Sequence, residues 1–196
     1  MGFSISGLIL TENFNREVSK VSENLEIGIE VLKKVESSWA TIRIEDEKEI
    51  YLGFNEEATI IYYEPSLYDQ KIYSQTTNSL NFQYFEGPMI FALRYVKDCE
   101  LKRRILSIDG DELLSIGRKL KVETQTDRIE SIVIDFAKQI SNFNILRLTK
   151  ETSVYQCRIK EYTGPKIRKS EKEINAMLTE RSISRNFKVG YDDLFQ

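Results

Sequence analysis

The stretch PMIFALRYVKDCELKRRILSIDGDELLSIG, residues 88–117, decides the fold class because it reads as short strands joined by tight turns. Phe91, Leu93 and Tyr95 recur at a spacing of two, which is typical of a half-buried strand. Asp109-Gly110 then separates two apolar runs. We predict a type I′ hairpin turn at this pair, since that turn needs positive φ at both central residues.

The acidic turn within residues 107–117 also allows an interpretation as a metal or phosphate loop. A calcium loop needs spaced acidic residues ahead of its glycine, but Gly110 follows Asp109 directly. A phosphate loop needs several glycines that lead into a helix, and this turn holds one. We therefore favour the hairpin turn, and we predict no catalytic residue, no metal site and no cofactor.

Helical spacing of apolar residues flanks the strand-rich region. Residues 12–27 and 127–141 each place apolar side chains three or four positions apart, while residues 3–10 read as a strand. Consecutive strands joined by short turns pair antiparallel. We expect an α+β fold: a mainly antiparallel sheet, built from residues 29–116, with the helices packed on one face and a small C-terminal helical appendage. The helical positions are Phe14, Val18, Val21 and Leu25 in the first segment, and Ile129, Ile132, Val133, Phe136 and Ile140 in the second.

The distribution of charged residues divides the chain into two parts. We predict an α+β domain over residues 1–145 and a C-terminal extension, residues 146–196, that packs on the domain or extends it. Residues 158–188 hold nine Lys or Arg against four Asp or Glu, a local excess of five positive charges. Because the whole chain carries -3, the remainder carries -8. The extension is therefore a basic appendage on an acidic body.

Composition excludes several classes of function. With 41% hydrophobic residues in 196, the chain can bury a core, and its 30% charged residues keep it soluble. The sequence contains no histidine, which removes Ser-His-Asp and Cys-His nucleophiles and every imidazole metal ligand. Two cysteines, Cys99 and Cys157, fit neither a disulfide framework nor a zinc cluster. No run approaches the ~18 apolar residues of a membrane span. Taken together, these features lead us to expect a non-enzymatic cytoplasmic protein with reduced thiols.

Two groups of residues are candidates for binding. Tyr62, Tyr63, Tyr68 and Tyr84 suit a partner-binding surface, because tyrosine is favoured at interfaces. The same residues fall on strand-like segments, where tyrosine also packs in cores, and we favour that interpretation. The second group, Lys166, Arg168 and Lys169, is a possible basic patch for phosphates. Interleaved glutamates and the net charge of -3 make nucleic acid an unfavoured partner.

Two segments resemble an uncharacterised bacterial protein family of unknown function. The opening MGFSIS, residues 1–6, is similar to the family's MGFS-[IL]-S start, and SIVIDFAKQISNFN, residues 131–144, is similar to its closing segment. This chain lacks the proline of that closing segment and has Asn142 in place of a glycine. The resemblance covers residues 1–145 and implies an α+β bacterial domain without a known activity.

The function that we expect from these features is binding of another protein. A small acidic domain without catalytic residues suits a bacterial immunity-like protein, which binds and blocks a toxin. The alternative is a binding module for a small ligand or nucleic acid that uses the basic segment 158–188. A homo-oligomer interface is the third possibility for the tyrosine-rich face.

Overall fold

The computed structural model describes residues 4–36, 44, 46, 48–64, 78–87, 89–98, 100–126, 128–145 and 152–161. The chain divides into two compact units, Met1–Pro165 and Lys166–Gln196, and every described residue belongs to the first. The predicted C-terminal helical appendage therefore lies outside the described residues.

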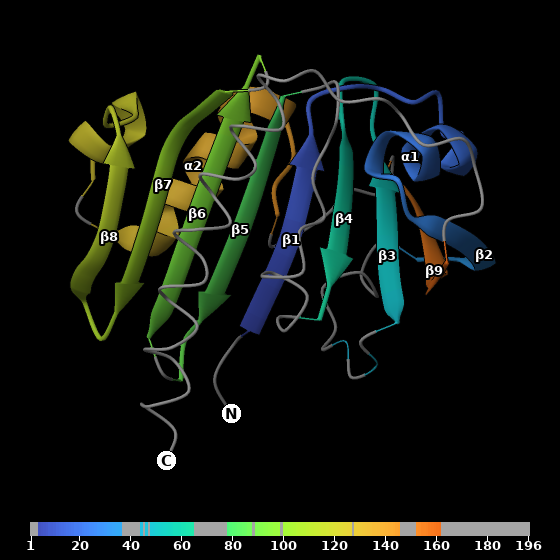
Figure 1. The fold of residues 1–196 in the computed structure, drawn as a ribbon, viewed down its shortest axis with the longest axis horizontal. Coiled ribbons are helices and arrows are strands. Elements are labelled where there is room, and N and C mark those ends of the chain that lie inside the picture. The colour runs from blue at the N-terminus through green and yellow to red at the C-terminus, as the bar shows by residue number, and fades with distance from the viewer. Residues whose placement is uncertain are drawn as a thin grey trace. The chain divides into compact units, whose positions relative to one another are not determined.

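In the described part of the chain, nine strands form one antiparallel sheet in the order β2-β9-β3-β4-β1-β5-β6-β7-β8 (Figure 1). Two α-helices and a short 3-10 helix accompany the sheet in these described ranges. The strands are β1 (Ser4–Leu10), β2 (Gly28–Val35), β3 (Glu49–Phe54), β4 (Thr59–Tyr63), β5 (Ser79–Phe85), β6 (Ile90–Lys97), β7 (Glu100–Ile108), β8 (Asp111–Gly117) and β9 (Ser153–Lys160). The helices are α1 (Val18–Leu25), the 3-10 helix η3 (Lys121–Thr124) and α2 (Ile129–Ser141). The α+β class and the mainly antiparallel sheet are confirmed.

The quoted stretch forms the meander β6-β7-β8. Ile108 pairs with Asp111 across the last turn, so Asp109 and Gly110 are its two central residues. Their φ angles are 52° and 87°, both positive as a type I′ turn requires. The predicted hairpin is confirmed. The positive φ at the second central position also explains why Gly110 is a glycine, because residues with a Cβ are disfavoured in the left-handed region.

Strand β1 lies at the centre of the sheet, although it comes first in the chain. It pairs with β4 on one side and with β5 on the other. Gly7 allows this close packing, because a Cβ there would lie 2.7 Å from the Phe82 ring and 2.8 Å from the Ile61 carbonyl oxygen. The sheet is therefore organised around the N-terminal strand and is larger than the predicted range 29–116.

The two helices pack on opposite faces of the sheet, which corrects the prediction of a single covered face (Figure 1). Ile9 belongs to the core that contains α2, whereas its neighbours Leu8 and Leu10 belong to the core that contains α1. We call these the α2-side core and the α1-side core. The central strands are buried on both faces, so each face needs its own cover.

Left-handed residues set the ends of both helices. The sequence predicts a first helix over residues 12–27, but Asn15 and Arg16 have φ of 53° and 62°, so α1 begins only at Val18. Phe14 precedes the helix and is still buried in the α1-side core. Left-handed residues follow the last turns of both helices, Glu26 after α1 and Asn142 after α2. A left-handed residue at this position stops a helix and leaves its last carbonyls to be capped.

The first compact unit continues past the predicted boundary at residue 145. β9 pairs with both β2 and β3, so residues 153–160 lie inside the sheet order. The unit extends to Pro165, which belongs to the Gly164-Pro165 break in the sequence. Residues 153–160 belong to the sheet because their alternating apolar side chains complete its faces; Val154 and Cys157 are fully buried.

Candidate functional site

The structure places the described candidate tyrosines in or against the core. Tyr62 and Tyr63 are each 1% exposed. The Tyr62 hydroxyl donates to the Ile145 carbonyl at 2.7 Å, and the Tyr63 hydroxyl donates to the Gly7 carbonyl at 3.2 Å. Burial raises the pKa of the Tyr62 hydroxyl above its ordinary value of 10.0. Tyr84 is half-buried against the α2-side core.

These positions support the core interpretation of the tyrosines over the binding-surface interpretation. A partner-binding anchor has to be accessible before the partner arrives, and Tyr62 and Tyr63 are not accessible. Tyr68 lies outside the described residues.

The predicted basic patch, Lys166, Arg168 and Lys169, also lies outside the described residues. Two other cations of the basic segment are described, and both are exposed on β9: Arg158 and Lys160. The Lys160 ammonium is 2.8 Å from the Glu30 carboxylate on β2. This exposed cross-strand ion pair contributes little to stability.

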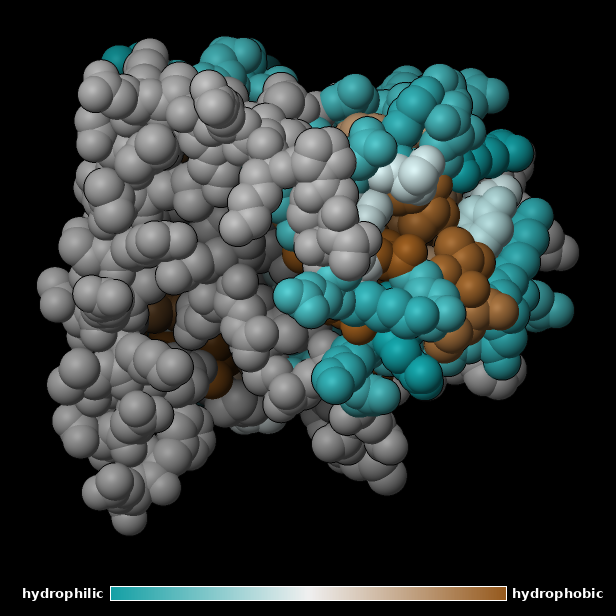
Figure 2. Space-filling model, turned by 45° about the vertical axis from the view of Figure 1, so that its right-hand side comes forward, coloured by the Kyte–Doolittle hydropathy of each residue, from teal (hydrophilic) through white to brown (hydrophobic). Residues whose placement is uncertain are grey.

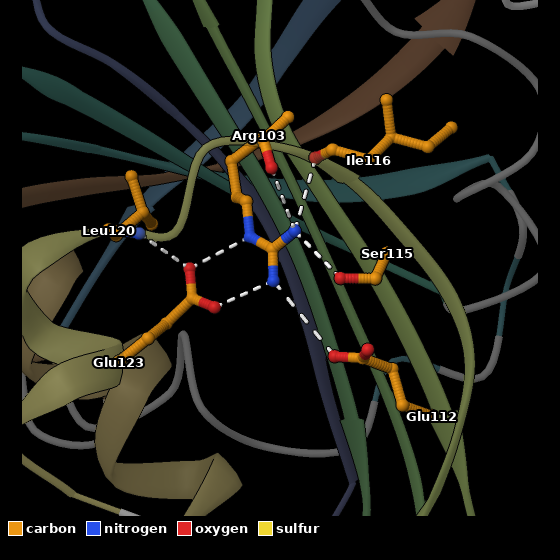
Figure 3. Close-up of polar contacts among 7 residues, drawn as sticks. Arg103, Glu112, Ser115, Ile116, Leu120 and Glu123 are labelled. Carbon is orange, nitrogen blue, oxygen red and sulfur yellow. Dashed lines mark hydrogen bonds and ion pairs between the residues drawn. The ribbon is translucent and has the colours of Figure 1, made fainter.

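A buried ion pair links β7 to η3 (Figure 3). Nε and Nη2 of Arg103 donate to the two carboxylate oxygens of Glu123 at 2.8 and 2.7 Å. The two side chains are 1% and 6% exposed. One oxygen of Glu123 also accepts the backbone N–H of Leu120 at 2.8 Å, at the start of η3. Such a two-pronged arginine–carboxylate contact is charge-assisted and fixed in geometry.

The third nitrogen of the same guanidinium faces β8. Nη1 of Arg103 donates to the Ser115 hydroxyl at 2.9 Å and to the Ile116 carbonyl at 3.2 Å. Glu112 lies further off, with its carboxylate 3.9 Å from Nη2, and its side chain is 52% exposed. Because nearly all donors of Arg103 are occupied by the chain itself, the contacts support a structural role in joining η3 to β7 and β8.

A second group of buried polar residues lies on the opposite face of β5, β6 and β7. In the strand register Asn81 pairs with Arg94, and Arg94 pairs with Arg104. Their neighbours Leu80, Leu93 and Ile105 belong to the α2-side core, so these three polar side chains face the other way. The two arginines are 7% and 9% exposed. We call Asn81, Arg94 and Arg104 the arginine row.

Sequence reasoning missed both arginine sites. Arg103 and Arg104 are consecutive residues of β7, so one points to each face, and both are buried. A charged residue inside a strand that is buried on both faces is the signal that could have found them. The sequence shows only that basic residues interrupt an apolar strand. Glu123, the acid that neutralises Arg103, lies twenty residues away and cannot be paired with it by spacing.

Groups with catalytic or metal-binding chemistry are sparse in the described part of the chain. Among the described residues, no three or more His, Cys, Asp or Glu side chains form a group that could hold a metal ion. Asp109, Asp111 and Glu112 project from the exposed hairpin. Burial raises the pKa of the Cys157 thiol from 9.0 to about 12, so this thiol is poorly suited to act as a nucleophile near neutral pH.

An apolar surface lies at the β2 end of the sheet. Val31 and Leu32 on β2 are 45% and 42% exposed, although both are large apolar residues. Figure 2 shows brown, apolar surface among hydrophilic residues on the side of the molecule that carries α1 and β2. Ile29 and Ile159, which pair across β2 and β9, pack against the α1-side core beside it. This apolar edge therefore continues the α1-side core to the surface.

The described ranges contain no helix that is long and apolar enough to cross a membrane. No protein-family model, no curated protein and no solved structure matches this chain.

Proposed function

We propose that this chain is a non-enzymatic, immunity-like protein that binds another protein by adding a strand of that partner to β2. The observation that carries the proposal is the pair of exposed apolar residues, Val31 and Leu32, on a strand at one end of the sheet order. Exposed apolar residues on an edge strand are a typical site for strand addition, in which main-chain hydrogen bonds provide affinity.

The side chains of β2 support an apolar contact. Val31 pairs with Cys157, which is fully buried in the α1-side core. Ile29 lies two residues earlier on the same face. A partner strand beside β2 would extend this face and cover apolar area that now meets solvent, which favours association.

The backbone of β2 limits where a partner strand can pair. The register shifts between Val31 and Lys33, so Leu32 is the extra residue of a β-bulge. Lys33 and Lys34 follow on the exposed end of the strand. Bulges and lysines are devices that prevent indiscriminate edge pairing. Residues 28–31 are therefore the part of β2 that suits a specific partner.

Charge supports a basic partner. Outside residues 158–188 the chain carries -8, and a field of one sign speeds encounters with molecules of the opposite sign. With Tyr62 and Tyr63 in the core, the aromatic anchors first expected for an immunity-like protein are replaced in this proposal by Val31 and Leu32.

The test uses a double variant, Val31→Glu with Leu32→Glu, and a matched control, Leu113→Glu. Leu113 is a similarly exposed apolar residue on β8, at the other end of the sheet order. A basic protein captured from the source organism by the wild-type chain is purified, and its affinity for all three chains is measured by calorimetry. We expect the double variant to weaken binding about 30-fold or more, the loss expected for a hot spot of about 2 kcal/mol. The control should bind like the wild type.

Three results would contradict the proposal. Equal affinity of the double variant and the wild type would place the contact elsewhere. A wild-type dimer that the double variant converts to a monomer would make β2 an interface between copies of this chain. Retention of nucleic acid or a small ligand, lost when Lys166, Arg168 and Lys169 are neutralised together, would favour the alternative function of segment 158–188.

A further inference from the structure

The outer edge of β8 is a template for pairing with another strand. β8 is the last strand of the sheet order, and in the part of the chain that the structure describes no strand pairs with its outer edge (Figure 1). Its residues are exposed or half-buried, and Leu113 is 49% exposed. The backbone of an edge strand directs N–H and C=O groups outward, where a further strand can bond to them. Which strand fits is therefore set by the side chains along β8.

Opposite charges gather at the two ends of β8. Three exposed acids lie at its start, and three exposed bases lie at and just after its end. The acids are Asp109, Asp111 and Glu112, and the bases are Arg118, Lys119 and Lys121. When two copies of this strand pair antiparallel, the acidic end of each meets the basic end of the other, which favours association. Parallel pairing would place like charges opposite each other, which destabilises a strand pair. The edge is therefore complementary in charge to a second copy of itself.

The side chains between the charged ends favour one antiparallel register with a second copy. Leu114 and Ile116 lie two residues apart and share one face of the sheet. When Ser115 lies opposite Ser115 of the second copy, Leu114 of each copy lies opposite Ile116 of the other. Apolar residues directly opposite each other cover area between them, which favours pairing. The same register places Asp111 beside Arg118 of the second copy, so the apolar pattern and the charge pattern agree.

A β-bulge in β8 makes the edge selective without blocking this register. The register of β7 and β8 shifts between Leu106 and Ser107, so Leu113 is the extra residue of the bulge on β8. In the two-copy register the bulge of one strand lies opposite the segment that ends at Gly117 of the other, where a glycine has no side chain to collide with it. A strand without this spacing would lose its register at the bulge, because bulges limit indiscriminate edge pairing.

We propose that two copies of this chain form a two-fold symmetric dimer by antiparallel pairing of their β8 strands, centred on Ser115. A two-fold contact repeats every pair, so each favourable pair counts twice, and the contact is closed because each copy uses the same edge. One strand edge from each copy covers less than the roughly 1,600 Å² of a standard interface, so the dimer is weak. The contact does not depend on the proposed function, and it leaves β2, at the other end of the sheet order, available to a protein partner.

Sedimentation velocity of the full chain measures this dimer. Between about 1 µM and about 1 mM chain, the wild type should change from monomer to dimer, as a weak contact does. Added salt should weaken the dimer, because the charge pairs at its ends are exposed and are screened by ions.

A charge swap tests the register. Asp111→Arg and Arg118→Asp each place like charges opposite each other at both ends of the paired strands, and each should weaken the dimer about tenfold. An equal mixture of the two variants should dimerise like the wild type. In the mixture the two altered residues face each other with opposite charges, and the native pair forms at the other end. The matched control is Glu57→Arg, which makes the same charge change at an exposed turn before β4 and should leave the dimer unchanged.

The β2 double variant, Val31→Glu with Leu32→Glu, separates this dimer from the proposed partner site. It alters the strand at the other end of the sheet order and should leave the dimer intact, while circular dichroism checks that every variant is folded. A wild type that stays monomeric at the highest of these concentrations would overturn the proposal. So would a mixture of Asp111→Arg and Arg118→Asp that associates no better than either variant alone, or a dimer that the β2 double variant abolishes.

Discussion

The carboxylate of Glu123 accepts hydrogen bonds from both Nε and Nη2 of Arg103, and the two residues lie twenty positions apart in a buried contact between η3 and β7. The contact orders the chain between β8 and α2, because Glu123 also caps the start of η3 through the N–H of Leu120. Through this pair, the edge hairpin is tied to the segment that leads into α2.

Glu123→Gln should lower the free energy of unfolding by about 3–5 kcal/mol, because it leaves the buried charge of Arg103 without a counter-charge. Urea unfolding followed by circular dichroism measures the loss. Glu112→Gln is the control, since its exposed carboxylate lies 3.9 Å from the same guanidinium, and it should cost less than about 1 kcal/mol. Similar losses in the two variants would show that the Arg103–Glu123 pair is not what stabilises this region.

Gly117→Ala should be more destabilising than Gly110→Ala, although both glycines have nearly the same φ, 86° and 87°. A Cβ on Gly110 would meet no atom within 4 Å, so only the left-handed backbone is strained, at about 1–2 kcal/mol. A Cβ on Gly117 would lie 2.1 Å from the Lys102 carbonyl oxygen and would force the β7–β8 pairing apart. Thermal unfolding of both variants ranks them, and the reverse order would contradict the register of β8.

Asp111→Asn should change stability by less than about 0.5 kcal/mol, because Asp111 is an exposed residue next to a turn that depends on backbone conformation. Thermal melts with and without calcium or magnesium should coincide for the wild type and the variant. Stabilisation by a divalent ion that Asp111→Asn abolishes would show that the hairpin is a metal site.

Tyr62→Phe should lower stability by about 1–2 kcal/mol and leave partner binding unchanged. The variant leaves the buried Ile145 carbonyl without its donor at 2.7 Å. Chemical denaturation gives the first quantity and calorimetry with the captured partner gives the second. Weaker binding at unchanged stability would instead restore Tyr62 as a contact residue.

The Cys157 thiol should make the chain less stable as pH rises from about 9 to about 12. Burial raises its pKa from 9.0 to about 12, so in this window the unfolded chain loses the proton that the folded chain keeps. The contribution is complete below pH 9 and is lost as pH rises through the window. Comparing the pH dependence of Cys157→Ala with that of the wild type isolates the effect, because the buried tyrosines are common to both chains. If the stability of the wild type and of Cys157→Ala changed equally with pH, the result would contradict the burial of this thiol.

The strand meander and the second helix could be predicted from the sequence because their signals are local. Asp109-Gly110 defines its own turn, and Ile132, Val133 and Phe136 have helical spacing that reappears as the buried face of α2. The position of β1 at the sheet centre, and of β9 between β2 and β3, depends on pairing between distant segments, which spacing alone does not encode.

The two-sided burial of the central strands had a sequence signal that the single-face prediction overlooked. Residues 58–63 are apolar or β-branched without alternation, a pattern typical of a strand buried on both faces. That pattern predicts a cover on each side and explains why Tyr62 and Tyr63 point into different cores. The arginine row and the apolar edge could not be read from sequence, since their meaning depends on which neighbours bury or expose them.

Amide hydrogen exchange of the chain with and without its captured protein partner tests the proposed strand addition to β2 most directly. A partner strand would protect the outward-facing amides of residues 28–31 in β2 (Gly28–Val35), because each would gain a main-chain hydrogen bond. The account predicts slower exchange in β2 and unchanged exchange in β8, the strand at the other end of the sheet order. Unchanged exchange in β2 while the partner is bound, or protection confined to β8, would contradict it.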